Sequence, residues 1–413
     1  MKDYTEFLKR ELVPALGCTE PIALAYCAAV AGAQMKDRPD RMEAIVSRNI
    51  YKNAHSVTVP ACGGRRGLEI ALVAGCFLGH PEKKLELLTD IDQDRLEEMD
   101  EKIRSGFVHL SFHPKEGGVY VEVKLFNAKE HCRVVLSGAH DHISRIEYND
   151  RLVKEDPLPA SECVLEEMSF QKILDFANHC DYRPLQEVLD RQIECNLKVA
   201  EQGLAGKWGC EIGRTLVENY ADYEDRLVAY GAAGSDARMG GCELPVVINA
   251  GSGNQGITVS VPLTIYARDH EVDQETFYRG LILANLLSLY IKQGVGKLSA
   301  YCGAVSAASA NAVGIAYLKG DSEQVMKDTL SNALAVNSGI LCDGAKASCA
   351  MKIASSLRNA FLALKQAERG TSFQKGDGMV KGDVDEMVRS VGIIAREGME
   401  QTDQVLLNVM MGD

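Results

Sequence analysis

The sequence lacks both a long apolar run and an excess of positive charge. No apolar stretch reaches the roughly 18 residues of a membrane-spanning helix, and the charged, amphipathic start of the chain does not resemble a leader peptide. Lys and Arg number 45 against 58 Asp and Glu, which gives a formal net charge of −13 at pH 7. Because nucleic acids and anionic membranes attract basic surfaces, we expect neither as a partner.

Histidine patterns typical of zinc enzymes are also missing. The chain has nine histidines but no HExxH motif, the helical pattern in which two histidines bind zinc and the glutamate acts as a base. His140 and His142 flank a turn, and we expect both to face solvent.

Cysteine, by contrast, is abundant, with 13 in 413 residues. Scattered cysteines in a chain of this size are typical of the reducing cytoplasm, so we predict a cytoplasmic protein with free thiols. Most of them are interpreted as small buried apolar residues.

The length allows two or three domains, and the patterning divides the chain in three. Residues 1–80 are predicted to be mostly helical. Residues 81–157 contain a possible strand at 85–91, a short charged helix and four runs of alternating polarity, typical of a small antiparallel α/β module. Residues 158–413 return to helical spacing with long Ala/Gly/Ser-rich stretches. We therefore predict an α+β fold, in which a mainly helical catalytic core (1–80 and 158–413) carries an inserted α/β module (81–157).

Three cysteines near the C-terminal end stand in Gly/Ala/Ser-rich sequence, where small side chains leave room for a bulky group. Cys342 and Cys349 are seven residues apart, and one continuous helix would separate them by roughly 10 Å of rise. Asp343-Gly344 can break such a helix, so we expect Cys342 in a loop, Cys349 at the start of the next helix and Cys302 in a separate loop. Three thiolates without a nearby histidine suit an iron–sulfur cluster better than a closed zinc site, although ordinary buried cysteines remain an alternative.

A second motif, Gly17-Cys18-Thr19-Glu20-Pro21, lies between an amphipathic segment and an apolar run. At a helix start the pKa of the Cys18 thiol is expected to be lowered, which would favour a reactive thiolate. The structural alternative is a helix N-cap at Cys18 or Thr19 with Pro21 in the first turn.

The sequence GSGNQG at residues 251–256 matches the glycine pattern of dinucleotide-binding proteins. That pattern must open a helix within a βαβ unit. The next segment, 257–267, is rich in β-branched residues and contains Pro262, so it does not favour a helix. A dinucleotide site is therefore not expected here.

Taken together, four segments resemble the L-cysteine desulfidase family, whose members are related to the α-chain of iron–sulfur L-serine dehydratases. The segments are PALGCTEPIALAYCAA (14–29), GSDARMGGCELPVVINAGSGNQGIT (234–258), SAYCGAVSAASA (299–310) and LCDGAKASC (341–349). The resemblance spans essentially the whole chain. It implies a lyase with a [4Fe-4S] cluster and without pyridoxal phosphate, which converts L-cysteine to pyruvate, hydrogen sulfide and ammonia.

Residue by residue, the resemblance implies that Cys302, Cys342 and Cys349 bind the cluster and leave one iron open. Cys18 would then be the base that removes the α-proton, or a resting ligand of the open iron. The related serine enzymes carry a histidine where Cys18 falls, and some use a C-terminal cysteine that this chain lacks. Both departures favour the cysteine branch.

An amino-acid substrate would be held by side chains from the same motifs. The candidates for its carboxylate and ammonium are Thr19, Ser252, Asn254 and Gln255, with Arg238 suited to a bidentate grip on the carboxylate. Asn53 and Lys297 are weaker candidates.

Three alternatives remain open at this point. An L-serine dehydratase could use the same cluster. An iron–sulfur sensor would need an output surface, typically a basic DNA-binding element, and none is visible. A pyridoxal-phosphate lyase would need a Schiff-base lysine, for which Lys346 is available. A homodimer is possible.

Overall fold

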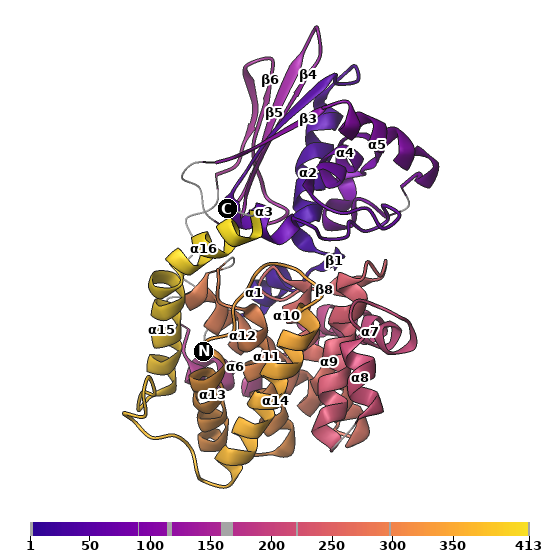
Figure 1. Cartoon of the computed structure of the whole chain (residues 1–413). Coiled ribbons are helices and arrows are strands. Elements are labelled where there is room, and N and C mark those ends of the chain that lie inside the picture. The colour runs from indigo at the N-terminus through magenta and orange to yellow at the C-terminus, as the bar shows by residue number, and fades with distance from the viewer. Residues whose placement is uncertain are drawn as a thin grey trace.

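The computed structural model describes residues 3–89, 91–113, 118–157, 168–219, 222–296 and 299–411. These residues form two lobes, one built on a β-sheet and one almost entirely helical (Figure 1). The predicted α+β, mainly helical fold is confirmed.

The sheet lobe contains six strands in the order β3-β2-β4-β5-β6-β7. They are β2 (Arg41–Val46), β3 (Val108–Phe112), β4 (Tyr120–Phe126), β5 (His131–Ser137), β6 (Ile143–Tyr148) and β7 (Arg151–Glu155). The four alternating runs seen in the sequence form β3 to β6. The sheet is mixed, because β2 pairs in parallel with β3 while the other neighbours are antiparallel.

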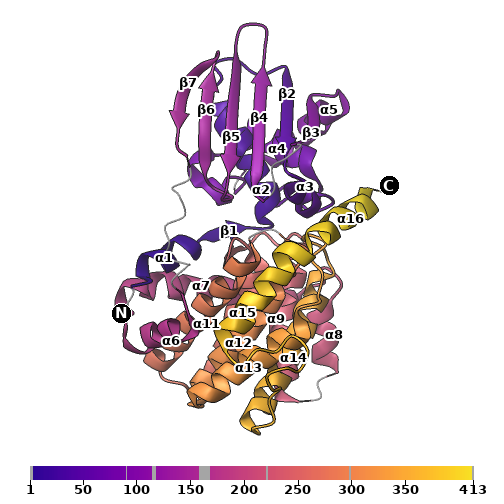
Figure 2. The same cartoon turned by 90° about the vertical axis from the view of Figure 1, so that its left-hand side faces the viewer.

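The sheet also recruits sequence from before residue 81. Strand β2 lies between β3 and β4, and helices α2 (Thr19–Gln34) and α4 (Leu68–Leu78) lie behind the sheet in the view of Figure 2. Helix α3 (Arg48–Ala54) and helix α5 (Leu96–Arg104) complete the lobe. The expected strand at 85–91 is wrong, since its first residues belong to a 3₁₀ helix, η1 (Pro81–Glu86), and Leu85, Leu87 and Leu88 are buried.

The helical lobe is packed around helix α12, which is buried along most of its length. The small side chains of α12 allow four helices, α10, α11, α13 and α14, to pack closely against it. The helices of this lobe are α1 (Thr5–Glu11), α6 (Phe170–His179), α7 (Gln186–Ala205), α8 (Ile212–Glu218), α9 (Tyr223–Met239), α10 (Gly253–Asp269), α11 (Gln274–Val295), α12 (Gly303–Lys319), α13 (Glu323–Asn337), α14 (Cys349–Glu368), α15 (Val384–Ile393) and α16 (Glu400–Met411).

Helix α10 contradicts the expectation for residues 257–267. The β-branched segment is helical despite Pro262, and nearly every residue of it is buried. Tertiary burial has overridden local propensity, which is only a weak predictor. The GSGNQG motif therefore does open a helix. The strand before it, β8 (Pro245–Val247), pairs antiparallel with β1 (Pro14–Leu16) in a two-stranded sheet, which is not a βαβ unit.

The β1–β8 pair brings the Gly17–Pro21 motif and the GSGNQG motif to the boundary between the lobes. Directly after β1, Gly17 has a φ of +62°, and a Cβ there would lie 2.1 Å from Cγ of Pro60. Glycine is thus required at this turn, which delivers Cys18 to the start of α2. No helix in the described part of the chain is long and apolar enough to cross a membrane.

The crossing of α2 and α4 offers a test of this packing. A Cβ on Gly75 would lie 2.2 Å from the backbone oxygen of Ala25. We expect Gly75→Ala to destabilise the protein by about 1–3 kcal/mol, because the two helix backbones must separate. Denaturant unfolding measures the change. Gly398→Ala is the matched control, since its nearest contact would be an ordinary 3.9 Å. Equal stability of the two variants would contradict the close crossing.

Candidate active site

Two loops of the helical lobe are joined by a short backbone ladder. Tyr301 and Leu341 form an antiparallel bridge, the amide of Cys302 donates to the carbonyl of Ile340 (3.0 Å), and the amide of Cys342 donates to that of Ala300 (2.6 Å). This pairing brings Cys302 and Cys342 together, although 39 residues lie between them in the sequence. Their thiols are close enough to hydrogen bond.

Cys349 joins them from the first turn of α14. Its Sγ accepts from the amide of Lys346 (3.4 Å) and contacts the carbonyl oxygen of Gly344 (3.6 Å). The expected placement is confirmed: Cys342 lies in a loop, Cys349 begins a helix and Cys302 comes from a separate loop.

The three thiols have different acid strengths. The hydrogen bond from Cys302 lowers the pKa of Cys342 to about 6, with nearby Lys52 acting in the same direction against the effect of burial. The same hydrogen bond and burial raise the pKa of Cys302, and burial raises that of Cys349.

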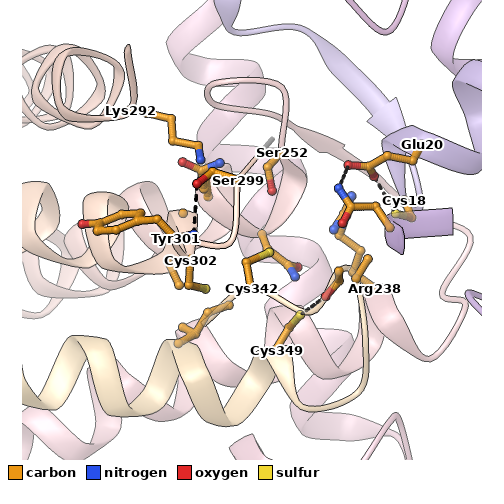
Figure 3. A pocket seen from close by; sticks show the side chains of 18 residues that line it. Cys18, Glu20, Arg238, Ser252, Lys292, Ser299, Tyr301, Cys302, Cys342 and Cys349 are labelled. Carbon is orange, nitrogen blue, oxygen red and sulfur yellow. Dashed lines mark hydrogen bonds between the residues drawn. The ribbon is translucent and has the colours of Figure 1, made fainter. Parts of the chain in front are cut away.

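All three thiols line one cavity of about 80 Å³ (Figure 3). A single water needs about 10–15 Å³ by the same measure, so the cavity has space for several small groups. Among the described residues, every predicted site residue except Thr19 lines it. Its lining residues are Cys18, Glu20, Asn53, Arg238, Ser252, Asn254, Gln255, Lys292, Ser299, Tyr301, Cys302, Gly303, Ala304, Cys342, Gly344, Ala345, Cys349 and Ile353.

Four long helices begin at this cavity. Cys18, Ser252 and Cys302 are the N-caps of α2, α10 and α12, and Cys349 is the first residue of α14. The first amides of a helix lack intrahelical partners and carry a partial positive charge. The cavity is therefore suited to anionic ligands.

Glu20 was not among the predicted site residues, yet its carboxylate lies among polar groups of four other residues. Its Oε2 accepts from Cys18 Sγ (3.0 Å) and Thr19 Oγ1 (3.2 Å), and its Oε1 accepts from Asn53 Nδ2 (3.0 Å). His140 Nε2 lies 3.8 Å from the same Oε1. Burial acts to raise the pKa of Glu20, but His140 and Cys18 outweigh it, so the pKa lies well below the usual value.

Cys18 itself differs from expectation. Its pKa is raised well above the usual value, because the thiol is buried and faces the Glu20 carboxylate. The expected lowering at a helix start is thus wrong, because a nearby anion and burial outweigh the helix terminus. Cys18 does occupy the N-cap position of α2, but its side chain donates to Glu20 and makes no capping hydrogen bond.

Thr19 lies just behind the cavity wall. Its hydroxyl contacts the carbonyl oxygen of Gly251 (3.0 Å) and thereby ties the start of α2 to the GSGNQG turn.

His140 was expected to face solvent, and this expectation is wrong because the side chain is buried. Only its position in three dimensions, beside Glu20 and Gly251, gives it a place near the site.

The polar wall opposite the cysteines has unsatisfied groups. Arg238, at the end of α9, lies against Gly253, where a Cβ would be 2.4 Å from its Nε. Among the described residues, buried atoms without a hydrogen-bond partner include Arg238 Nε, Asn53 Oδ1, Asn254 Oδ1 and Gln255 Oε1. A buried polar atom left unpaired costs about 1–3 kcal/mol, so such a group points to a missing ligand.

Helix α3 anchors the loop that carries Cys342 and Cys349. Lys52 Nζ donates to the carbonyl of Cys342 (3.2 Å) and pairs with Asp403 of α16, while Lys346 Nζ donates to the carbonyls of Lys52 and His55. Lys346 is thus engaged outside the cavity, which removes the support for a Schiff base there. Lys292 does line the cavity, and burial lowers its pKa to about 8. Lys297 lies outside the described residues.

Comparison with known proteins identifies the family of the chain. Residues 82–408 match the family described as serine dehydratase alpha chain. The chain belongs to this family. Its relatives include UPF0597 proteins of Lachnoclostridium phytofermentans (42% identical, 99% of both chains covered), Finegoldia magna (39%, 100% of both) and Treponema denticola (39%, 99% of this chain and 98% of the relative). The predicted relationship to the iron–sulfur serine dehydratases is confirmed, and it supports a lyase.

The donor set is consistent with the iron–sulfur cluster that the family suggests. No group of three His, Cys, Asp or Glu side chains among the described residues is placed to bind a single metal ion. A cluster differs from a single ion, because each cysteine binds its own iron and the sulfurs need not converge on one point. Three cysteines around one cavity meet that requirement: Cys302 at the start of α12, Cys342 in the loop between α13 and α14, and Cys349 at the start of α14.

A pH-dependent stability test follows from Glu20. Its folded-state pKa lies below the unfolded value near 4.5, so its ionised form stabilises the fold above that pH and the contribution is lost as the pH falls toward the folded pKa. Glu20→Gln should cost about 1–3 kcal/mol at pH 7. Denaturant titrations at pH 7 and pH 4 should show that the difference in free energy of unfolding between wild type and Glu20→Gln is smaller at pH 4. Glu6→Gln, at an exposed position, is the control. A gap that does not change with pH would contradict this assignment.

Proposed function

We propose that the protein is an iron–sulfur-dependent lyase that degrades L-cysteine to pyruvate, hydrogen sulfide and ammonia. The observation that carries the proposal is the cavity itself: three cysteines from separate segments face a wall of unsatisfied amide and guanidinium groups. Cys302, Cys342 and Cys349 would hold a [4Fe-4S] cluster. Three protein ligands would leave one iron of such a cluster open, and that iron would supply a Lewis acid for the departing sulfur.

The substrate is proposed to bind between the cysteines and the start of α10. Arg238 has a buried guanidinium nitrogen without a partner, which suits a carboxylate. Ser252, Asn254 and Gln255 lie in the first turn of α10, where amide groups also favour an anion. Thr19 supports this turn through Gly251 and does not itself face the cavity.

Cys18 is proposed to take the α-proton, with Glu20 holding its side chain in place. The pKa of Cys18 is raised, so its thiol is protonated at rest and would act as a base only after losing this proton to solvent. Glu20 Oε2, 3.0 Å from Sγ, accepts the hydrogen bond of the thiol and orients it, but the low pKa of Glu20 makes it too weak a base to take the proton. As the thiolate, Cys18 would take the α-proton, the C–S bond would break and sulfide would leave. The remaining aminoacrylate tautomerises and reacts with water to give pyruvate and ammonia, so the atoms balance.

The alternative is a serine dehydratase that eliminates water from L-serine at the same cavity, as the family name suggests. The argument for cysteine is the sequence resemblance, in which Cys18 replaces the histidine of the serine enzymes. In the structure, Cys18 and Glu20 form one hydrogen-bonded pair, so the replacing residue has a partner that orients its side chain.

The direct test is an anaerobic assay of pyruvate and sulfide with the cluster-loaded protein. We expect equal amounts of both from L-cysteine, with a kcat/KM at least about tenfold above that for pyruvate from L-serine, which corresponds to about 1.4 kcal/mol. A preference for L-serine would instead support the dehydratase.

The ligand assignment is tested by single cysteine substitutions. Cys302→Ala, Cys342→Ala and Cys349→Ala should each lower the iron content and visible absorbance of the reconstituted protein and abolish sulfide release. Cys195→Ala is the matched control, because this thiol lies on α7 away from the cavity. A full iron content in any of the three variants would remove that cysteine from the ligand set.

A further inference from the structure

Asn53 lies between Glu20 at the start of α2 and Gly344 in the loop that carries Cys342. It lies in the last turn of α3 and is only 5% exposed. Its Nδ2 donates to Glu20 Oε1 (3.0 Å), while its Oδ1 has no hydrogen-bond partner among the described residues. One end of this amide is therefore satisfied and the other is not.

The orientation of the Asn53 amide is set by its partner. A carboxylate only accepts hydrogen bonds, so the amide must present its nitrogen to Glu20 and its oxygen to the other side. Cys18 and Thr19 already donate to the second oxygen of Glu20, which leaves Oε1 for Asn53. Turning the amide would set two oxygens against each other in a buried place.

The space beside Asn53 Oδ1 is kept open by a glycine. Gly344 has a φ of +91°, and a Cβ on it would lie 3.1 Å from this oxygen and 2.5 Å from the carbonyl oxygen of Lys52. Both Asn53 and Gly344 line the cavity. The unpaired acceptor thus has room for a ligand atom between α3 and the cysteine loop.

Only a hydrogen-bond donor can satisfy this oxygen. In an α-amino acid the ammonium carries three N–H donors, whereas the ionised carboxylate has none. Among the described residues that line the cavity, Arg238 Nε and the Tyr301 hydroxyl are unpaired buried donors, and Asn254 and Gln255 carry further unpaired acceptors. Of the two donors, only Arg238 carries a positive charge. That donor suits a carboxylate, and the acceptors suit an ammonium.

We propose that Asn53 Oδ1, oriented by Glu20, binds the α-ammonium of the substrate and makes the site selective for compounds with a free amino group. This specificity role rests on the proposed function, since it assumes an amino-acid substrate. It assigns opposite ends of that substrate to separate elements: the ammonium to α3 and the carboxylate to the end of α9.

The experiment compares two unreactive ligands that differ only in the amino group. L-Alanine and propionate both lack a leaving group at the β-carbon, and calorimetry measures their binding to the cluster-loaded protein without turnover. Wild type should bind L-alanine more tightly than propionate. Asn53→Ala should reduce this preference about tenfold, by weakening L-alanine binding while propionate binding stays constant.

Two variants control the interpretation. Asn49→Ala, on the same helix but hydrogen-bonded to Asp403, should leave the preference unchanged. Arg238→Met should weaken both ligands alike, because both carry the carboxylate.

Each adverse result has a distinct meaning. The ammonium role is overturned if Asn53→Ala keeps the preference, or if its affinity for propionate falls as much as its affinity for L-alanine. Turnover of L-cysteine by wild type would still uphold the proposed function in that case. If wild type neither binds L-alanine nor turns over any amino acid, both proposals fail.

Discussion

The convergence of four helix N-termini on one cavity is the constraint on which the site depends. Helices α2, α10, α12 and α14 all begin there, so their unpaired amides give the cavity a positive potential that no single loop could supply. The backbone ladder between Tyr301 and Leu341 then sets the direction of the cysteine loops. Side-chain chemistry follows from this frame: thiols on one wall, amides and Arg238 on the other.

Glu20 links that frame to the sheet lobe. It lies in the first turn of α2, a helix that covers the sheet, and it contacts Asn53 on α3 and His140 beyond β5. A buried carboxylate is tolerated only where several donors surround it, and here they come from three separate segments. The sheet lobe is therefore part of the site, and it supplies Cys18, Glu20 and Asn53 to the cavity wall. Its own mixed sheet positions these groups and has no residue in the cavity wall.

Much of this could be predicted from the sequence, because period-2 alternation and small-residue spacing report local structure directly. The strands of β3 to β6 and the placement of the three cysteines follow from such signals. The errors concern tertiary context. The pKa of Cys18 depends on burial beside Glu20, and His140 is buried by a neighbour far away in sequence. Helix α10 forms because its apolar residues are enclosed on all sides, which no local pattern reveals.

The cavity wall runs from Cys18 to Ile353, so it draws on both ends of the described chain. A ribosome must therefore release almost the entire polypeptide before the pocket exists. Any group that binds in this pocket therefore meets a chain that is already almost completely synthesised. Truncated products, lacking α14, would retain two of the thiols but no enclosed place for them.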